Sequence, residues 1–91
     1  MKTKDIQLSD KFIKHYKLRI RGNKNLEKRY IDRLNIFLND PSTDILKLHK
    51  LKGKYKGLLS FSIAGDLWII LQEFENYYIF YDIGSHNQVY K

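Results

Sequence analysis

The first part of the chain carries apolar residues at the spacing of an amphipathic helix. Ser9 is a suitable N-cap residue, and Gly22 supplies a stop. Between them, the apolar side chains that fall on one helical face are Phe12, Ile13, Tyr16 and Ile20. The pattern predicts a helix from Asp10 to about Ile20.

A second helical pattern follows after a short gap. Asn23 or Asn25 can cap it, and the Asn39-Asp40-Pro41 sequence ends it, because proline cannot continue the hydrogen-bond ladder. Its apolar stripe consists of Leu26, Tyr30, Leu34, Phe37 and Leu38. The short connection between the two predicted helices indicates an antiparallel helical hairpin.

After about Gly57 the apolar residues come in short β-branched and aromatic runs. Leu59 to Ile63 alternates apolar residues with serines, which is typical of a half-buried strand. Denser runs predict strands at Leu67 to Phe74 and Tyr77 to Ile83, and a weaker signal in Met1 to Leu8 allows one more. The predicted fold is α+β, an N-terminal helical hairpin packed on a small twisted antiparallel sheet.

Length and composition narrow the class of protein. The 91 residues fit a single domain, 1–91, whose chemistry we expect on a surface groove because so small a core leaves little room for a cavity. Without cysteine the chain can form neither a disulfide nor a thiolate metal site. It has neither an apolar signal core nor a run long enough to cross a bilayer, so the expected location is cytoplasmic. The net charge of +7 predicts a polyanionic partner, either nucleic acid or an acidic protein.

The basic residues are most concentrated in the segment 47–56, which reads KLHKLKGKYK. In an extended conformation, residues two apart point the same way, so the lysines can form a row of cations along successive phosphates. This row would consist of Lys50, Lys52, Lys54 and Lys56. Tyr55 offers a ring on which a base can stack, and a solvated loop is the alternative interpretation.

Two of the three histidines are candidates for acid–base chemistry. His15 falls within the first predicted helix and is expected at the surface, whereas His49 lies in the lysine-rich segment and His86 follows the last strand. Such a pair can act as general base and general acid in RNA cleavage, a reaction that requires no metal ion or other cofactor. Asp66 either stabilises its own turn or orients a histidine.

Two aromatic residues are further candidates. Trp68 and Tyr90 can stack on bases, although aromatic residues near strand ends also serve in packing. The candidate RNA-binding residues are therefore the four lysines, Tyr55 and Trp68.

Several spaced motifs occur together in the second half of the chain. They are His49-x-Leu51-x-Gly53-x-Tyr55-x-Gly57, Ser60-Phe61-Ser62, Gly65-Asp66, Asp82-Ile83-Gly84-Ser85-His86 and Val89-Tyr90. In this order, after a helical hairpin, they resemble the YafQ branch of the RelE/ParE toxin superfamily. The resemblance extends over essentially the whole chain and is most specific from residue 47 onward.

The resemblance implies both a fold and a function. The fold is the RelE-like microbial ribonuclease fold, and the function is that of the toxin in a type II toxin–antitoxin pair. Such toxins enter the ribosomal A site and cut mRNA, and a cognate antitoxin wraps around them. By position, His49 and His86 match the catalytic histidines of the family, Asp66 its acidic residue, and Tyr90 its aromatic residue near the scissile phosphate.

The chain also departs from the family pattern. Many relatives carry an arginine where this chain has Leu67-Trp68, and some have a basic residue at Asp82 and a histidine at Ser62. Loss of a fixed guanidinium near the phosphate costs about 3–4 kcal/mol of transition-state stabilisation. The alternatives are therefore a weakened nuclease, a non-catalytic inhibitor that binds the ribosome or poisons gyrase, and a basic domain that only binds an acidic protein.

Overall fold

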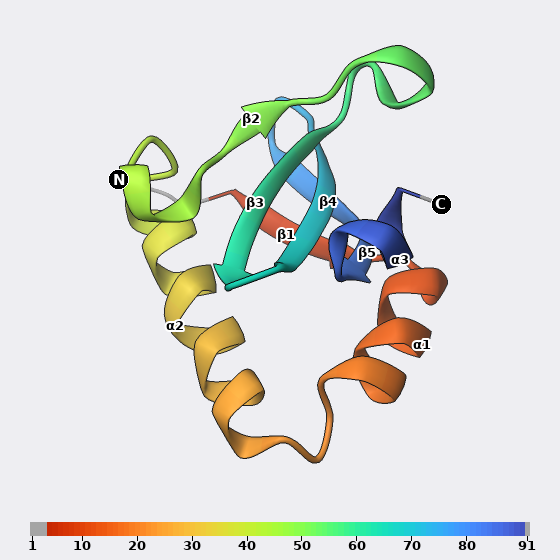
Figure 1. Ribbon diagram of the computed structural model, residues 1–91. Coiled ribbons are helices and arrows are strands. Elements are labelled where there is room, and N and C mark those ends of the chain that lie inside the picture. The colour runs from red at the N-terminus through yellow and green to blue at the C-terminus, as the bar shows by residue number, and fades with distance from the viewer. Residues whose placement is uncertain (1–3, 91) are drawn as a thin grey trace.

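A five-stranded mixed sheet forms the centre of the computed structural model, which describes residues 4–90 (Figure 1). The order of the strands across the sheet is β1-β5-β4-β3-β2. The strands are β1 (Asp5–Leu8), β2 (His49–Lys50), β3 (Leu59–Ala64), β4 (Leu67–Glu73) and β5 (Tyr77–Gly84). The helices are α1 (Asp10–Arg19), α2 (Lys24–Asn39) and α3 (His86–Val89), with 3-10 turns at Asp44–Leu46 and Gly53–Tyr55.

The first two helices begin at the caps that the sequence indicates. The Ser9 side chain accepts a hydrogen bond from the Phe12 N–H of α1, and Asn23 accepts one from the Leu26 N–H of α2. The chain turns between them at Gly22, whose φ of 92° is a conformation that glycine adopts without strain. Both predicted helices are confirmed, with Asn23 rather than Asn25 as the second cap.

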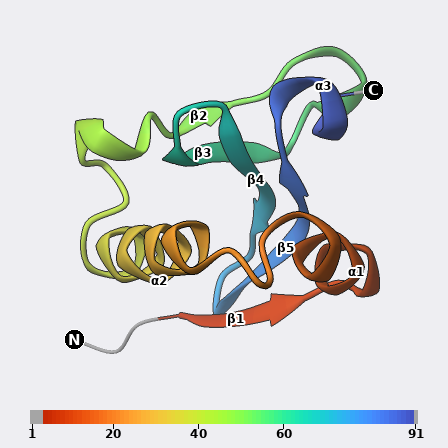
Figure 2. The same ribbon diagram turned by 60° about the horizontal axis from the view of Figure 1, so that its bottom comes forward.

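The two helices cover one face of the sheet (Figures 1 and 2). The main core lies between them and the strands, and Phe37 stacks on Phe61 with ring centroids 4.6 Å apart. The helices diverge from the loop that joins them, so the hairpin is open (Figure 1). They meet through an edge-to-face contact of Tyr16 with Tyr30, at 5.0 Å. Each helix is therefore held mainly by the sheet.

The sheet contains one pairing that differs from the expected antiparallel pattern. The pairs β2–β3, β3–β4 and β4–β5 are antiparallel, whereas β1 runs parallel to β5. The weak strand signal near the N-terminus is therefore a real strand at Asp5–Leu8, while residues 1–3 lie outside the described part of the chain. In the sequence, two helices and three strands lie between β1 and β5. This connection is long enough for β1 to run parallel to β5, at the edge of the sheet away from β2.

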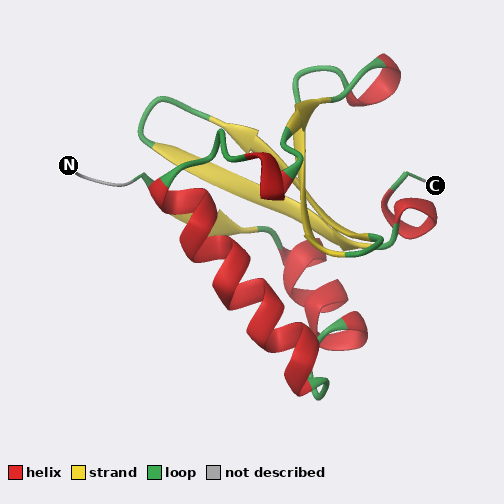
Figure 3. Ribbon diagram, turned by 60° about the vertical axis from the view of Figure 1, so that its left-hand side comes forward, coloured by secondary structure: helices red, strands yellow, loops and turns green. Residues whose placement is uncertain are grey.

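The opposite face of the sheet carries a second, smaller core. Ile70 packs there with Leu51 and with Val89 of the short helix α3. In Figure 3, α3 is the short helix next to the C-terminus. Helix α3 was not among the predicted elements, although the chain carries its start signal. Ser85 and Gln88 form a capping box, in which each side chain bonds the backbone N–H of the other.

The lysine-rich segment does not form the straight extended row that was expected. Only His49–Lys50 is a strand, and the chain then curls into the 3-10 turn Gly53–Tyr55. The turn begins at Gly53, which has a φ of 66°. A helical turn rotates successive side chains around its axis, so the lysines do not keep the strict alternation of one extended strand.

Candidate functional site

A surface groove of about 480 Å³ brings together residues from β2, β4 and α3. One wall comes from the lysine-rich segment, and the rest comes from β4 and the C-terminal residues, which lie far from that segment in the sequence. The lining residues are His49, Lys50, Leu51, Lys52, Trp68, His86 and Tyr90. The fold thus places both candidate histidines on one concave surface beside two lysines and two aromatic rings.

One ring nitrogen of His49 is held by the backbone, and within residues 4–90 the other forms no hydrogen bond. Its Nδ1 lies 2.9 Å from the carbonyl oxygen of Lys47, which has a left-handed backbone with φ of 52°. Since a carbonyl can only accept, Nδ1 carries the proton and the lone pair of the neutral ring is on Nε2. The ring also meets Trp68 edge to face at 5.7 Å. His49 is therefore oriented as a proton acceptor.

Asp66 connects the β3–β4 turn to the start of α3. Its Oδ1 accepts two hydrogen bonds of 3.1 Å, one from the backbone N–H of His86 and one from the indole N–H of Trp68. Within residues 4–90, its hydrogen bonds are to these two groups and not to an imidazole ring. Asp66 therefore orients His86 through the backbone, and it fixes the Trp68 ring at the same time.

The aromatic candidates form a chain of contacts beneath α3. The ring of His86 lies 4.5 Å from that of Tyr90, and Tyr90 meets Tyr55 edge to face at 5.5 Å. The Tyr55 hydroxyl donates a 3.4 Å hydrogen bond to the Val89 carbonyl. Tyr55 thus supports α3 and Tyr90 from below, whereas Trp68 and Tyr90 line the groove and remain available to a base.

The four candidate lysines fall into separate groups. Lys50 and Lys52 line the groove that holds the histidines. Lys50 also lines a neighbouring groove of about 450 Å³ together with Lys56 and Glu73. Lys54 lies over the Tyr55 ring at 5.2 Å. A phosphate beside the two histidines would therefore meet Lys50 and Lys52 first.

A buried acidic residue, Asp82, contacts several basic side chains of α1, a cluster that was not among the predicted site residues. Asp82 is 3% exposed, and its Oδ1 is 2.5 Å from His15 Nδ1 and 3.5 Å from an Arg19 guanidinium nitrogen. Lys11 lies 3.7 Å from Oδ2. His15, for which a surface position was expected, is mostly buried in this contact, with 18% of its side chain exposed. The spacing of Lys11, His15 and Arg19, four residues apart on one helical face, is a signal that could have revealed the cluster.

The Asp82 cluster closes the edge of β5 where β1 no longer covers it. The Ile83 N–H donates to Asp82 Oδ1 at 2.8 Å, and the Ile83 carbonyl accepts from Arg19 at 2.7 Å. At Gly84 an added Cβ would lie 2.6 Å from the same guanidinium. Arg19 therefore packs directly against the backbone that leads into His86.

Residues 4–90 contain neither a cluster of metal-binding side chains nor a membrane-spanning helix. Among residues 4–90, no three histidine, aspartate or glutamate side chains are grouped closely enough to hold a metal ion. In the same part of the chain, no helix has both the length and the apolar character needed to cross a membrane.

Comparison with solved structures shows the same architecture in bacterial toxins. YafQ from E. coli has 24% identity and a TM-score of 0.76, with 97% of this chain and 99% of that chain covered. YafQ in the E. coli DinJ-YafQ toxin–antitoxin complex has 20% identity and a TM-score of 0.77, covering 99% and 100%. YoeB from Staphylococcus aureus, solved as a dimer, has 20% identity and a TM-score of 0.75, covering 93% and 99%. These similarities confirm the α+β, RelE-like fold.

The family itself is shown by the sequence. No curated protein matches the chain. Residues 4–91, however, match the family model described as the bacterial toxin of type II toxin-antitoxin system, YafQ. Within the described residues, the match spans the three α-helices, the five strands and every residue that lines the groove. The chain therefore belongs to the YafQ family of type II toxin–antitoxin toxins.

Proposed function

We propose that this toxin is an mRNA endoribonuclease that acts on the ribosome, with His49 and His86 as its acid–base pair. The observation that carries the proposal is that both histidines line one groove with Lys50 and Lys52. The groove is open, as a site for an RNA strand must be. The orientation of His49 supports its role as the base, because the Lys47 carbonyl leaves Nε2 free to accept a proton.

The proposed reaction is an internal transfer of the phosphate. His49 Nε2 takes the proton from a ribose 2′-OH, and the 2′ oxygen forms a bond to the adjacent phosphorus. The bond from phosphorus to the 5′ oxygen breaks, and His86 supplies the proton that this leaving oxygen needs. The products are an upstream fragment ending in a 2′,3′-cyclic phosphate and a downstream fragment with a 5′-OH. No metal ion or other cofactor takes part.

Lys50 and Lys52 would stabilise the charge that builds up on the phosphate oxygens. Lysines act as flexible point charges, whereas an arginine offers a fixed pair of donors. We therefore expect slower cleavage than in relatives with an arginine at the site. Trp68 and Tyr90 supply the rings on which bases stack, and Asp66 holds Trp68 and the start of α3 in place.

The partners follow from the same comparison. E. coli YafQ has been solved in complex with DinJ, and this chain has the same fold and a net charge of +7. We infer that it binds an antitoxin of its own, which keeps it inactive in the cell. Its other partner would be the mRNA in the ribosomal A site. A protein of this size, with a net charge of +7 and an open groove, is suited to bind RNA there.

Mapping of RNA ends tests the proposal. The purified chain is added to a translating extract with a defined mRNA, and to the same mRNA without ribosomes. We expect new 5′-OH ends within ribosome-occupied codons only, and loss of these ends in the His49→Ala, His86→Ala double variant. Lys50→Ala and Lys52→Ala should reduce the cleavage rate, whereas Lys28→Ala on the exposed surface of α2 serves as the matched control.

Each other result points to one of the remaining functions. Blocked translation without new RNA ends would refute the nuclease and favour an inhibitor that binds the ribosome. DNA damage without loss of mRNA would indicate gyrase poisoning. Cleavage that persists at full rate in the double variant would refute the role of the histidines.

A further inference from the structure

The side chain of Arg19 reaches the turn that precedes His86, although Arg19 belongs to α1. Its guanidinium nitrogen Nη1 donates a 2.7 Å hydrogen bond to the Ile83 carbonyl. A Cβ at Gly84 would lie 2.6 Å from the same nitrogen and 2.7 Å from the side-chain oxygen of Gln88 in α3. The guanidinium and α3 therefore flank Gly84 closely, and only glycine leaves the space that both need.

Asp82 holds the guanidinium in this place. Its Oδ1 lies 3.5 Å from Arg19 Nη1, and the residue is 3% exposed. A carboxylate buried so deeply needs charged or hydrogen-bonding partners, which here are Arg19 and His15 of α1. Arg19 does not line the groove of the histidines. Its contacts therefore reach His86 through the backbone that leads into α3.

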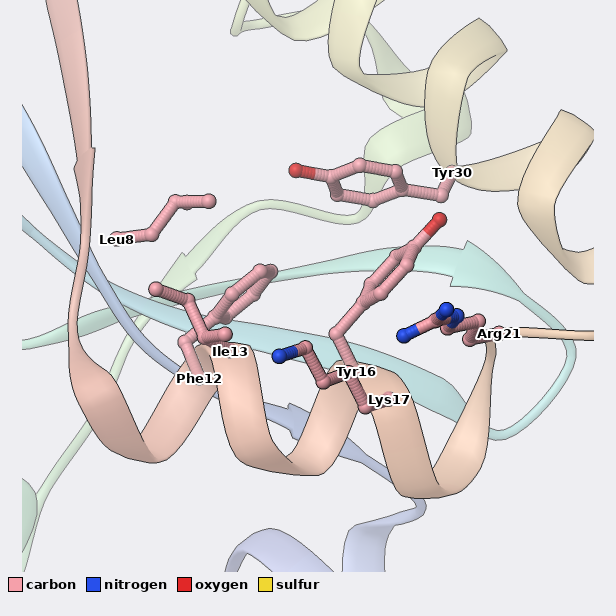
Figure 4. A pocket seen from close by; sticks show the side chains of 7 residues that line it. All are labelled: Leu8, Phe12, Ile13, Tyr16, Lys17, Arg21 and Tyr30. Atoms are coloured by element: carbon pink, nitrogen blue, oxygen red, sulfur yellow. The ribbon is translucent and has the colours of Figure 1, made fainter.

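The helix that carries Arg19 is itself firmly packed. Figure 4 shows Phe12 and Tyr16 on the side of α1 that faces Tyr30 of α2. Their ring centroids lie 6.2 Å and 5.0 Å from that of Tyr30, and Phe12 also packs on Phe80 of β5 at 5.7 Å. Because α1 is held to both α2 and the sheet, it is a fixed support from which Arg19 contacts the turn.

Helix α3 depends on such external contacts. It has only four residues, and a helix this short is unstable on its own. Asp66 binds the N–H of His86 at its start, and Tyr55 binds the carbonyl of Val89 at its end. Arg19 adds a contact on the turn between β5 and α3. A displacement of about 1 Å at a catalytic group can slow a reaction by roughly 100-fold, so the geometry of this turn bears directly on proton transfer.

We propose that Arg19, held by Asp82, is a positioning residue for His86. It fixes the backbone at Ile83 and Gly84 and thereby the place from which His86 donates its proton to the leaving 5′ oxygen. The inference deepens the proposed function and rests on the role of His86 as general acid. An acidic residue at position 82 attracts this guanidinium, whereas a basic residue there would repel it.

An mRNA with a sulfur leaving atom tests the positioning role. Single-turnover cleavage is measured on ribosomes that carry one of two mRNAs. One mRNA is unmodified, and in the other a sulfur replaces the 5′ oxygen of the linkage that end mapping identifies as cleaved. A thiolate leaves without a proton because thiols are far more acidic than alcohols, so the second mRNA does not need the general acid. The His86→Ala variant, which should be slow on the first mRNA only, calibrates the comparison.

We expect Arg19→Ala to slow cleavage of the unmodified mRNA by about 10- to 100-fold and to change cleavage of the sulfur-containing mRNA by less than about threefold. Its affinity for the ribosomes should not change. Arg19→Lys keeps one donor for the Ile83 carbonyl, so it should show a smaller loss with the same dependence on the leaving atom. If circular dichroism shows that Arg19→Ala is unfolded, Arg19→Lys decides the question. Arg29→Ala, at an exposed arginine of α2, is the matched control.

Two results would overturn the positioning role and leave the proposed function intact. One is equal slowing of both mRNAs in the folded Arg19 variants, which would indicate a general structural role. The other is an unchanged rate on the unmodified mRNA. If His86→Ala instead slowed both mRNAs equally, His86 would not be the general acid, and the proposed mechanism itself would be refuted. Absence of cleavage by the unmodified chain would refute the nuclease.

Discussion

Removal of the buried carboxylate at Asp82 should destabilise this protein more than most single substitutions. Asp82 binds His15, Arg19 and the Ile83 N–H. The substitution Asp82→Ala would leave two basic side chains next to each other without their shared partner. It would also leave the Ile83 N–H without an acceptor at the edge of β5. Both changes raise the free energy of the folded state.

The magnitude follows from the burial of these groups. Breaking a buried ion pair from one side costs about 3–5 kcal/mol. His15 and Arg19 keep 18% and 19% of their side chains exposed, so water can partly replace the lost partner. We therefore expect the lower end, about 3 kcal/mol. A chain of this length has a total stability of about 5–14 kcal/mol, and the loss should lower Tm by roughly 12–24 °C.

Urea denaturation and thermal unfolding, followed by circular dichroism, measure this loss. Asp82→Asn keeps an acceptor for the Ile83 N–H and should fall between the unmodified chain and Asp82→Ala. Asp32→Ala is the control, because Asp32 is exposed on α2 and should change stability by less than about 0.5 kcal/mol. A loss of less than about 1 kcal/mol in Asp82→Ala would refute the reasoning. Such a result would mean that water solvates the side chains of His15 and Arg19 as favourably as the Asp82 carboxylate does.

Three further predictions concern individual residues. Tyr30 has a folded-state pKa of about 12 against 10 in the unfolded chain, because burial disfavours its charged form. The stabilisation from the protonated Tyr30 hydroxyl is therefore present below pH 10 and is lost as the pH rises towards 12. The free energy of unfolding, measured with urea, should fall over this range, and it should fall less steeply in Tyr30→Phe. Gly84→Ala should cost about 1–3 kcal/mol because its Cβ meets the Arg19 guanidinium, and an Arg19→Ala background should reduce the cost in a double-mutant cycle. Among residues 4–90, the buried Ser60 hydroxyl has no hydrogen-bond partner, so Ser60→Ala should raise stability by up to about 1 kcal/mol in the same urea assay, and a loss of stability would contradict this.

Local patterns were sufficient to predict most of the fold. The caps at Ser9 and Asn23 and the apolar periodicity identified two helices, alternation identified one strand, and dense apolar runs identified two more. These features depend on residues close in sequence, so they can be read from the chain. The parallel pairing of β1 with β5 could not, since pairing joins segments that nothing in the local sequence connects. The short helix α3 was missed although its capping box is visible in the sequence.

The candidate site shows the same division. The sequence determined which groups are available: two histidines outside the first helix, a basic segment that contains the first of them, and aromatic residues in the second half of the chain. Only the tertiary structure decided which of them share a groove. It placed Lys50 and Lys52 beside His49 and His86, whereas Lys54 lies over the ring of Tyr55, which packs against Tyr90. Sequence spacing sets the direction of side chains within one element, whereas a groove forms where separate elements meet.

The clearest case is Asp82. By sequence it is a departure from the family pattern, an acidic residue where some relatives carry a basic one. In the fold it is a buried carboxylate that holds α1 against the edge of β5, through His15 and Arg19. The sequence determined the charge at each of these positions. Only the packing of α1 against β5 brought the charges within bonding distance, and only that distance makes them stabilising.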